Sequence, residues 1–245
     1  MGKGCVMFVS WLFFVLSTMS FVGNAAELVG EIEQPISKAY FPVGFDVDDS
    51  AQFMVMGKFK NSCFQMGTIF TSVDRQKKRI EVQLTGYEYK GNCVETEVSF
   101  YQVVPLGVIG VEGEFHVYDR VSKNKLGVLE FKKASESESG TDEFLYAPLL
   151  DASLVERSAS GKKILSLQGV FHDSCLKLKK VTVALHGEVL VVLPTIHRPS
   201  REGCRGGDFP FKEEVLIRES LPQSFMLHVR SMGGQAINKM VYLMK

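Results

Sequence analysis

The sequence of 245 residues lacks most of the features that assign a chain to a common functional class. Its formal charge is zero, with 28 lysines and arginines against 28 aspartates and glutamates. Nucleic-acid-binding proteins normally carry an excess of basic residues, so no nucleic-acid partner is expected. Past residue 26 no apolar run is long enough to cross a bilayer. Hydrophobic residues still make up 45 %, which is ordinary for a globular protein and excludes a mostly disordered chain.

Catalytic and metal-binding motifs are also missing. The chain contains no G-x-S-x-G, no H-E-x-x-H, no phosphate-binding loop and no EF-hand loop. Asp46, Asp48 and Asp49 form an acidic cluster, which we interpret as a solvated loop, with a calcium site as the alternative. We therefore expect no catalytic residues, no metal site and no cofactor.

The first 26 residues predict export. Lys3 is their only charge, an apolar run covers residues 6–16, and small residues end the segment at Ala25 and Ala26. This is the pattern of a secretory signal peptide, with an uncleaved membrane anchor as the alternative. Cleavage would leave a chain that begins near Glu27 and has no membrane span. We expect a periplasmic or secreted protein.

An internal repeat divides the rest of the chain. Residues 57–63 and 169–175 both read G-x-F-x-[ND]-S-C and lie 112 positions apart. In each copy the next cysteine follows, after 30 positions in the first and 29 in the second. Two later pairs match in the same order: His116 with His228, and Asn124 with Asn238. A period of this length is the size of a small domain and is too long for a solenoid repeat.

The repeat predicts two domains with one disulfide each. The first covers residues 27–133, an acidic polar linker covers 134–144, and the second covers 145–245. Four cysteines in an exported chain allow three pairings. If each copy folds by itself, the pairs are Cys63–Cys93 and Cys175–Cys204. A zinc site is disfavoured because the chain has no C-x-x-C pair.

The alternation of apolar and polar residues predicts an all-β chain. Residues 181–185 and 188–193 read as a hairpin around His186 and Gly187. In the first copy the expected strands lie near 36–41, 51–60, 66–73, 79–84, 96–104, 114–119 and 125–131. The predicted fold class is two tandem, duplicated β-sandwich domains of the immunoglobulin-like kind, each with one internal disulfide. The only tryptophan, Trp11, lies in the signal peptide, so the buried tryptophan of true immunoglobulin domains is absent.

Two features have both a functional and a structural interpretation. His116 and His228 hold the same place in the two copies, and each is either a ligand-contacting or acid–base residue or an outward-facing strand residue. The structural interpretation is favoured. The basic residues between 75 and 79 are interpreted as a charged hairpin tip, with contact to anionic lipid or polysaccharide as the alternative.

The predicted function is binding of a protein or envelope glycan without catalysis, and a hydrolase inhibitor is one form of it. The copies share framework residues but differ in two loops, which suggests loops used for recognition. The candidate partner-binding residues are Tyr87, Tyr89, Arg198, Arg201 and Arg205. A hydrolase with a site between the domains is one alternative, which a buried ionisable cluster there would favour. An envelope assembly factor is the other, which a flat apolar patch would favour.

Overall fold

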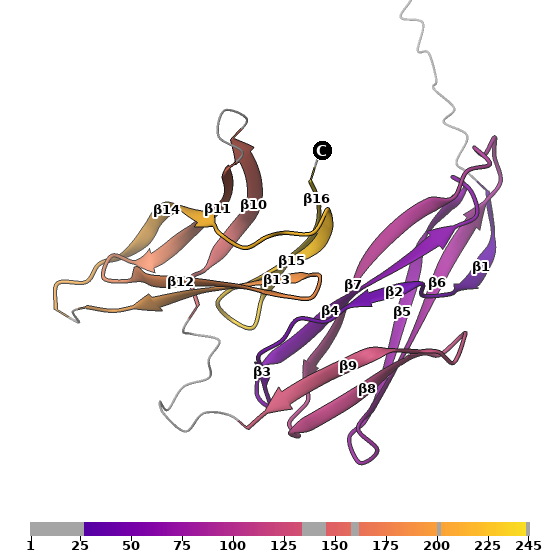
Figure 1. Cartoon of the computed structure of the whole chain (residues 1–245), viewed down its shortest axis with the longest axis horizontal. Helices are drawn as coiled ribbons and strands as arrows, with labels where there is room; N and C mark the ends of the chain where they lie inside the picture. Colours follow the sequence, from indigo (N-terminus) through magenta and orange to yellow (C-terminus); the bar gives the residue numbers. More distant parts are fainter. Residues whose placement is uncertain (1–26, 134–145, 158–161, 200–201, 244–245) are drawn as a thin grey trace, which may run out of the picture.

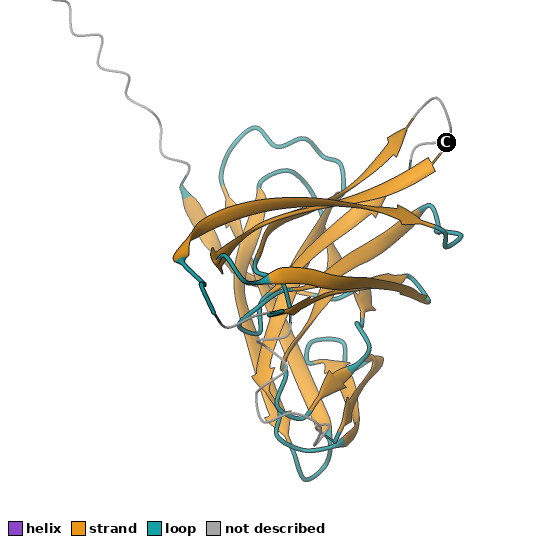
Figure 2. Ribbon diagram, turned by 90° about the vertical axis from the view of Figure 1, so that its left-hand side faces the viewer, coloured by secondary structure: helices purple, strands orange, loops and turns teal. Residues whose placement is uncertain are grey.

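The computed structural model describes residues 27–133, 146–157, 162–199 and 202–243. Within these ranges the chain forms strands joined by turns and loops, without any helix (Figures 1 and 2). The same ranges accordingly contain no helix that is long and apolar enough to cross a membrane. The predicted signal peptide and linker lie outside the described residues.

Strands β1 to β9 form what we call the N-terminal unit. Its smaller sheet has the order β2-β4-β7, and its larger sheet has the order β1-β6-β8-β9-β3, with β5 also paired to β6. The strands are β1 (Leu28–Gln34), β2 (Lys38–Tyr40), β3 (Phe45–Asp46), β4 (Ser50–Phe59), β5 (Phe64–Asp74), β6 (Arg79–Tyr89), β7 (Val98–Val108), β8 (Gly113–Asp119) and β9 (Lys125–Lys132).

Strands β10 to β16 form the C-terminal unit. Its two sheets have the orders β10-β11-β14 and β12-β13-β15-β16. The strands are β10 (Leu149–Arg157), β11 (Lys162–Asp173), β12 (Lys177–His186), β13 (Val189–His197), β14 (Gly206–Ile217), β15 (Ser224–Arg230) and β16 (Ala236–Tyr242).

The two units share one pattern of strand pairing. The path β5-β6-β8-β9 of the first corresponds to β12-β13-β15-β16 of the second, and β2-β4-β7 corresponds to β10-β11-β14. In both units one pair is parallel, β6 with β8 and β13 with β15. His116 lies opposite Arg79 and His228 lies opposite Val191, so the same offset of 112 relates both members of each pair. The predicted equivalence of the two histidines is confirmed.

The pairing also shows two departures from the sequence prediction. Immunoglobulin sheets are antiparallel, so the parallel pair in each unit is a difference from that topology. The proposed match of Asn124 with Asn238 is wrong. Asn238 lies opposite His228 on β16, whereas the residue opposite His116 is Val128, and Asn124 precedes β9.

Each unit has its own hydrophobic core between its two sheets. In the N-terminal unit Phe53 of β4 and Phe115 of β8 are fully buried in this core. In the C-terminal unit Leu165 of β11 and Phe225 of β15 have the same role. Inward and outward residues alternate along these strands, as the sequence pattern predicts.

The residues around the repeated motif are placed as predicted. Phe59 and Phe171 are both buried, with 4 % and 6 % of their surface exposed. The disulfides are Cys63–Cys93 and Cys175–Cys204, so the predicted pairing is confirmed. Each closes a loop of about 30 residues, which stabilises a fold by about 3.5 kcal/mol in the chain-entropy model.

The predicted strands agree well with the observed ones. All seven expected in the first copy are present, but β1 and β3 were missed. The hairpin of β12 and β13 turns at Gly187 and Glu188, one residue later than predicted, because His186 still pairs with Val189. Gly187 has a φ of +59°, a conformation that favours glycine.

Candidate functional site

The two units meet through the outer faces of two sheets (Figure 1). The sheet β2-β4-β7 of the N-terminal unit packs on the sheet β12-β13-β15-β16 of the C-terminal unit. We call this contact the junction. Its central residues point away from their own cores and are buried by the other unit. They are Tyr40, Met54, Val189, Val191 and Met226.

The two remaining sheets carry polar residues at positions that match the centre of the junction. Arg79 holds in the N-terminal unit the place that Val191 holds in the C-terminal unit. Ser166 holds in the C-terminal unit the place of Met54, which lies 112 positions earlier. Burying charged and hydroxyl groups without partners is unfavourable. The two copies therefore differ at the positions that form the apolar contact.

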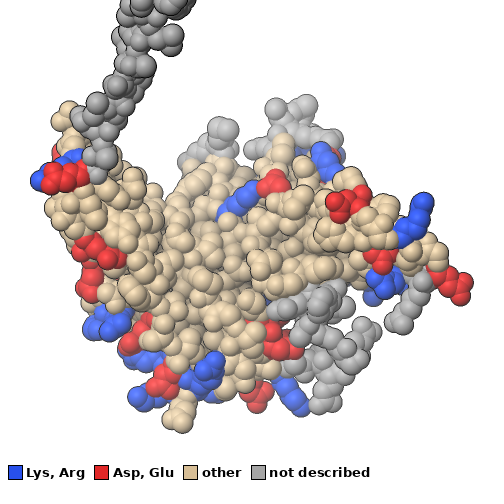
Figure 3. Space-filling view, turned by 180° about the vertical axis from the view of Figure 1, so that it is seen from behind, with Lys and Arg blue, Asp and Glu red and all other residues tan. Residues whose placement is uncertain are grey.

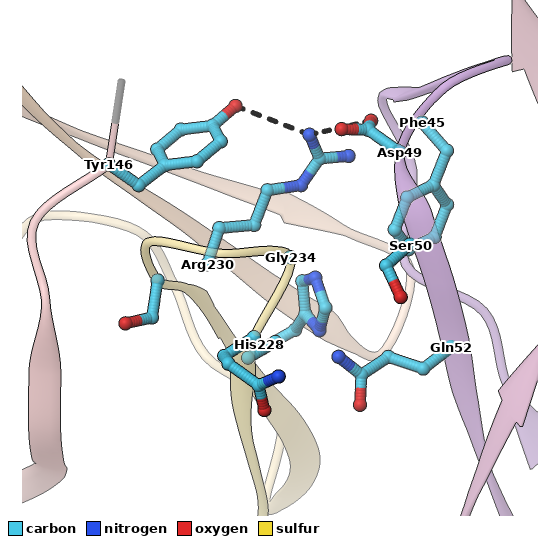
Figure 4. A pocket seen from close by; sticks show the side chains of 11 residues that line it. Phe45, Asp49, Ser50, Gln52, Tyr146, His228, Arg230 and Gly234 are labelled. Atoms are coloured by element: carbon cyan, nitrogen blue, oxygen red, sulfur yellow. Dashed lines mark hydrogen bonds and ion pairs between the residues drawn. The ribbon is translucent and has the colours of Figure 1, made fainter. Parts of the chain in front are cut away.

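A buried ion pair lies at one edge of the junction (Figure 4). Nη1 of Arg230, on β15, donates to Oδ2 of Asp49 at 2.9 Å, and the two side chains are 7 % and 8 % exposed. The same Nη1 donates to the hydroxyl of Tyr146 at 3.2 Å, while Nη2 donates to the carbonyl oxygen of Gly44. The guanidinium also lies 4.7 Å from the ring centre of Phe45. Arg230 thus ties the C-terminal unit to the loop around β3.

This loop corrects the interpretation of the acidic cluster. Asp49 is buried and not solvated, because its Oδ2 accepts both from Arg230 and, at 2.8 Å, from the backbone N–H of Asp46. Gly44 has a φ of +84°, which lets the chain turn and aim its carbonyl at the guanidinium. The carboxylate is a structural partner of an arginine that lies 181 residues away in the sequence.

His228 extends the polar network across the junction. Its Nδ1 lies 2.6 Å from Oδ1 of Asn238, and Nδ2 of Asn238 donates to Oε1 of Gln52 at 2.8 Å. Because an amide oxygen only accepts, Nδ1 carries the proton. Burial, opposed by the Asn238 bond and assisted by the nearby Arg230 charge, lowers the pKa of His228 from 6.5 to about 4. His228 is therefore neutral at pH 7 with a free lone pair on Nε2.

A small pocket separates His228 from Arg230 (Figure 4). It is lined by both of them together with Phe45, Ser50, Tyr146 and the 231–236 turn. Its volume, counted as space open to the centre of a water molecule, is about 20 Å³. Among the described residues, Nε2 of His228 and Nε of Arg230 are two of four buried side-chain atoms without a hydrogen-bond partner. The sequence interpretation placed His228 on the correct face but missed that the other unit covers it.

A larger pocket lies on the other side of the 231–235 turn. It has a volume of about 300 Å³ and an apolar wall that includes Leu150 and Met232. His172 and Asp208 line it, with Nδ1 of His172 at 2.9 Å from the carboxylate. Both side chains are largely exposed, at 75 % and 78 %. The pair orients the imidazole at a solvent-facing surface.

The structure separates the predicted partner-binding residues into two groups. Tyr87 and Tyr89 are half-buried and belong to strand β6 instead of a loop. Arg198 and Arg205 are exposed beside the second disulfide, and Nη2 of Arg198 donates to Asp173 at 2.6 Å. Arg201 lies outside the described residues. The end of β6 and the start of β14 lie at opposite ends of the molecule (Figure 1), so the two groups do not form one surface.

Metal-ligating side chains gather at one place in the described ranges. Asp173, Cys175 and Cys204 offer atoms within 4.8 Å of one another. The two sulfurs form a disulfide with each other, and a disulfide offers no thiolate to a metal. This cluster is therefore explained by the covalent link.

Neither the surface charge nor the comparison with other proteins assigns the chain to a functional class. On the face seen in Figure 3, charges of both signs are scattered toward the edges and no patch of one sign dominates. Comparisons of the chain with protein-family models, with curated proteins and with solved structures found no match. We therefore infer function from the geometry alone.

Proposed function

We propose that this chain is an exported protein of the cell envelope or exterior that binds a partner and does not catalyse a reaction. In this proposal residues 1–26 are a cleaved signal peptide, and residues 27–133 and 145–245 are two duplicated β-sandwich domains. They are immunoglobulin-like in having nine and seven described strands in two packed sheets, apart from the parallel pair. Disulfides persist in oxidising compartments, which supports a periplasmic or secreted location.

The main support for this proposal is that the charges of the buried polar cluster between the units are paired with each other. An ionisable cluster between the units was expected to favour a hydrolase, but the charges of Arg230 and Asp49 are paired with each other. The pKa of His228, at about 4, is far below the value near the working pH that suits a general base. The adjoining space is also far smaller than the several hundred Å³ of a small-molecule site. The cluster is best explained as a clamp that holds the two units together.

The exposed loop beside the second disulfide is the proposed contact surface for a protein or an envelope glycan. Arg198 and Arg205 are both exposed, and guanidinium groups pair well with carboxylate or phosphate groups. The Cys175–Cys204 bond fixes this loop, which lowers the conformational entropy lost on binding. The structure supports this loop more strongly than Tyr87 and Tyr89, which are half-buried in a strand.

A capture experiment tests the proposal. The oxidised protein is used as bait with the envelope fraction of its source, beside the variant Arg198→Ala/Arg205→Ala and the control Lys58→Ala/Lys60→Ala on the other unit. The arginine variant should lose the captured partner while keeping its melting temperature, and the control should retain it. Equal capture by both variants would contradict a role for this loop.

A hydrolase is the second candidate, and the pair His172 and Asp208 is the observation that favours it. A carboxylate that holds Nδ1 of an imidazole leaves Nε2 available as a general base, as in serine hydrolases. The pair lies at a pocket of about 300 Å³, which is large enough for a small substrate. Turnover of peptide, ester, glycan or phosphate substrates that disappears in His172→Gln would favour this candidate over binding.

A further inference from the structure

The polar groups of the junction form two short chains of hydrogen bonds that end near each other on β15. Gln52 of the N-terminal unit accepts from Asn238, and Asn238 accepts from Nδ1 of His228. On the same strand, Arg230 donates to Asp49, which again belongs to the N-terminal unit. Each chain crosses the junction once, and the interruption between the two chains lies between His228 and Arg230.

The two atoms at this interruption have opposite hydrogen-bonding character. Nε2 of His228 is an acceptor, because the single proton of the neutral ring is on Nδ1. Nε of Arg230 is a donor. Both atoms are buried and have no partner among the described residues. Leaving a buried donor and a buried acceptor unsatisfied is unfavourable, and native structures rarely do so without a compensating group.

The geometry of β15 brings the two groups to one pocket. Residues two apart on a strand point to the same face, with their backbones about 7 Å apart. His228 and Arg230 both line the same cavity, as does Ser50 (Figure 4). Its volume of about 20 Å³ is enough for a water molecule, which needs a cavity of about 10–15 Å³. It is far smaller than the sites that hold small-molecule ligands.

We propose that this pocket is a binding site for one integral water molecule, which accepts from Nε of Arg230 and donates to Nε2 of His228. A water molecule has both the donor and the acceptor that the interruption requires, and buried waters typically satisfy groups of this kind. It joins the two chains into one that runs from Gln52 to Asp49. A chain of hydrogen bonds that crosses the junction at both ends favours one relative placement of the two sheets, because any slide breaks several bonds at once.

The equivalent histidine of the N-terminal unit provides the control. His116 occupies the same strand position as His228. The residue opposite it is Val128, whereas the residue opposite His228 is Asn238. Two residues later the first copy has Tyr118, whereas the second copy has Arg230. His116 is half-buried on a face that the other unit does not cover. Its Nδ1 is also buried without a partner among the described residues, but His116 lacks the asparagine that fixes the tautomer and the arginine two residues later that would hold the water.

Deuteron magnetic relaxation dispersion of the oxidised protein tests the site, because it counts water molecules that stay bound for longer than nanoseconds. His228→Leu should have one long-lived water fewer than the unmodified protein, and His116→Leu should have the same number. An unchanged count in His228→Leu, or an equal loss in His116→Leu, would overturn the proposal.

The unmodified protein provides a second test that does not require the variant to fold. In a crystal structure at high resolution, a density peak should lie about 2.7–3.2 Å from both nitrogens. Nitrogen-15 spectra at pH 7 should show His228 with its proton on Nδ1. A proton on Nε2 would place two donors face to face and would overturn the proposal, as would a direct bond from either nitrogen to a protein atom.

Discussion

Replacing Arg230 by methionine should be among the most damaging single changes to the fold. Methionine keeps most of the apolar stem but removes the guanidinium, so the buried carboxylate of Asp49 loses the ion pair with Arg230. Both side chains are more than nine-tenths buried, at 7 % and 8 % exposure. Removing one member of such a pair destabilises a protein by about 3–5 kcal/mol, mostly because a charge is left uncompensated.

Two comparisons separate the charge effect from a loss of packing. The double variant Arg230→Met/Asp49→Asn carries no unpaired charge, so it should recover part of the loss, with a coupling of about 0.5–3 kcal/mol. Lys239 and Asp151 form an ion pair at 2.5 Å, but they are 44 % and 45 % exposed. Lys239→Met should therefore cost no more than about 1 kcal/mol.

Urea unfolding of the oxidised protein, followed by far-ultraviolet circular dichroism, measures these differences. Tryptophan fluorescence is not a suitable probe, because the only tryptophan is Trp11 in the predicted signal peptide. A loss below about 1 kcal/mol for Arg230→Met would refute the reasoning, since it would place this pair in the range of exposed ion pairs.

Three further predictions concern pH, the apolar face and the second disulfide. Folding lowers the pKa of His228 from 6.5 to about 4, so between these pH values the unfolded chain binds a proton on His228 that the folded protein does not. The free energy of unfolding should therefore drop by about 3 kcal/mol as the pH falls from 6.5 to 4. His228→Gln should remove most of this pH dependence. Its charged neighbour is Arg230, paired with Asp49. Val191→Arg, which copies Arg79 of the other unit, should split thermal unfolding into two transitions, and a single unchanged transition would contradict the junction. Cys175→Ser should cost about 2–5 kcal/mol in urea unfolding, and a loss near zero would show that this bridge is not a constraint on the fold.

Local patterns made most of the strands and both disulfides predictable from the sequence. The alternation of Phe53 and Val55 with their neighbours marks a strand, and the matched cysteine spacings select one pairing. These features depend on residues that are close in the chain or repeated within it. The strand β3 is only two residues long, so it gives no pattern to recognise.

The junction was missed because it depends on contacts between residues far apart in the sequence. Asp49 and Arg230 are separated by 181 residues, and Gln52 and Asn238 by 186. One signal was available: Met54 lies between Phe53 and Val55, so this strand is apolar on both faces. Such continuous runs indicate a strand that is covered on both sides. The segment 189–193 has the same property.

Residual dipolar couplings of the oxidised protein test most directly whether the junction holds the two units as one body. The account predicts that a single alignment tensor fits the backbone couplings of residues 27–133 and 146–243 together, with the two units oriented as the ion pair of Arg230 and Asp49 requires. Two different tensors in the unmodified protein would show that the units move independently, and would contradict the clamp on which the proposed binding function rests.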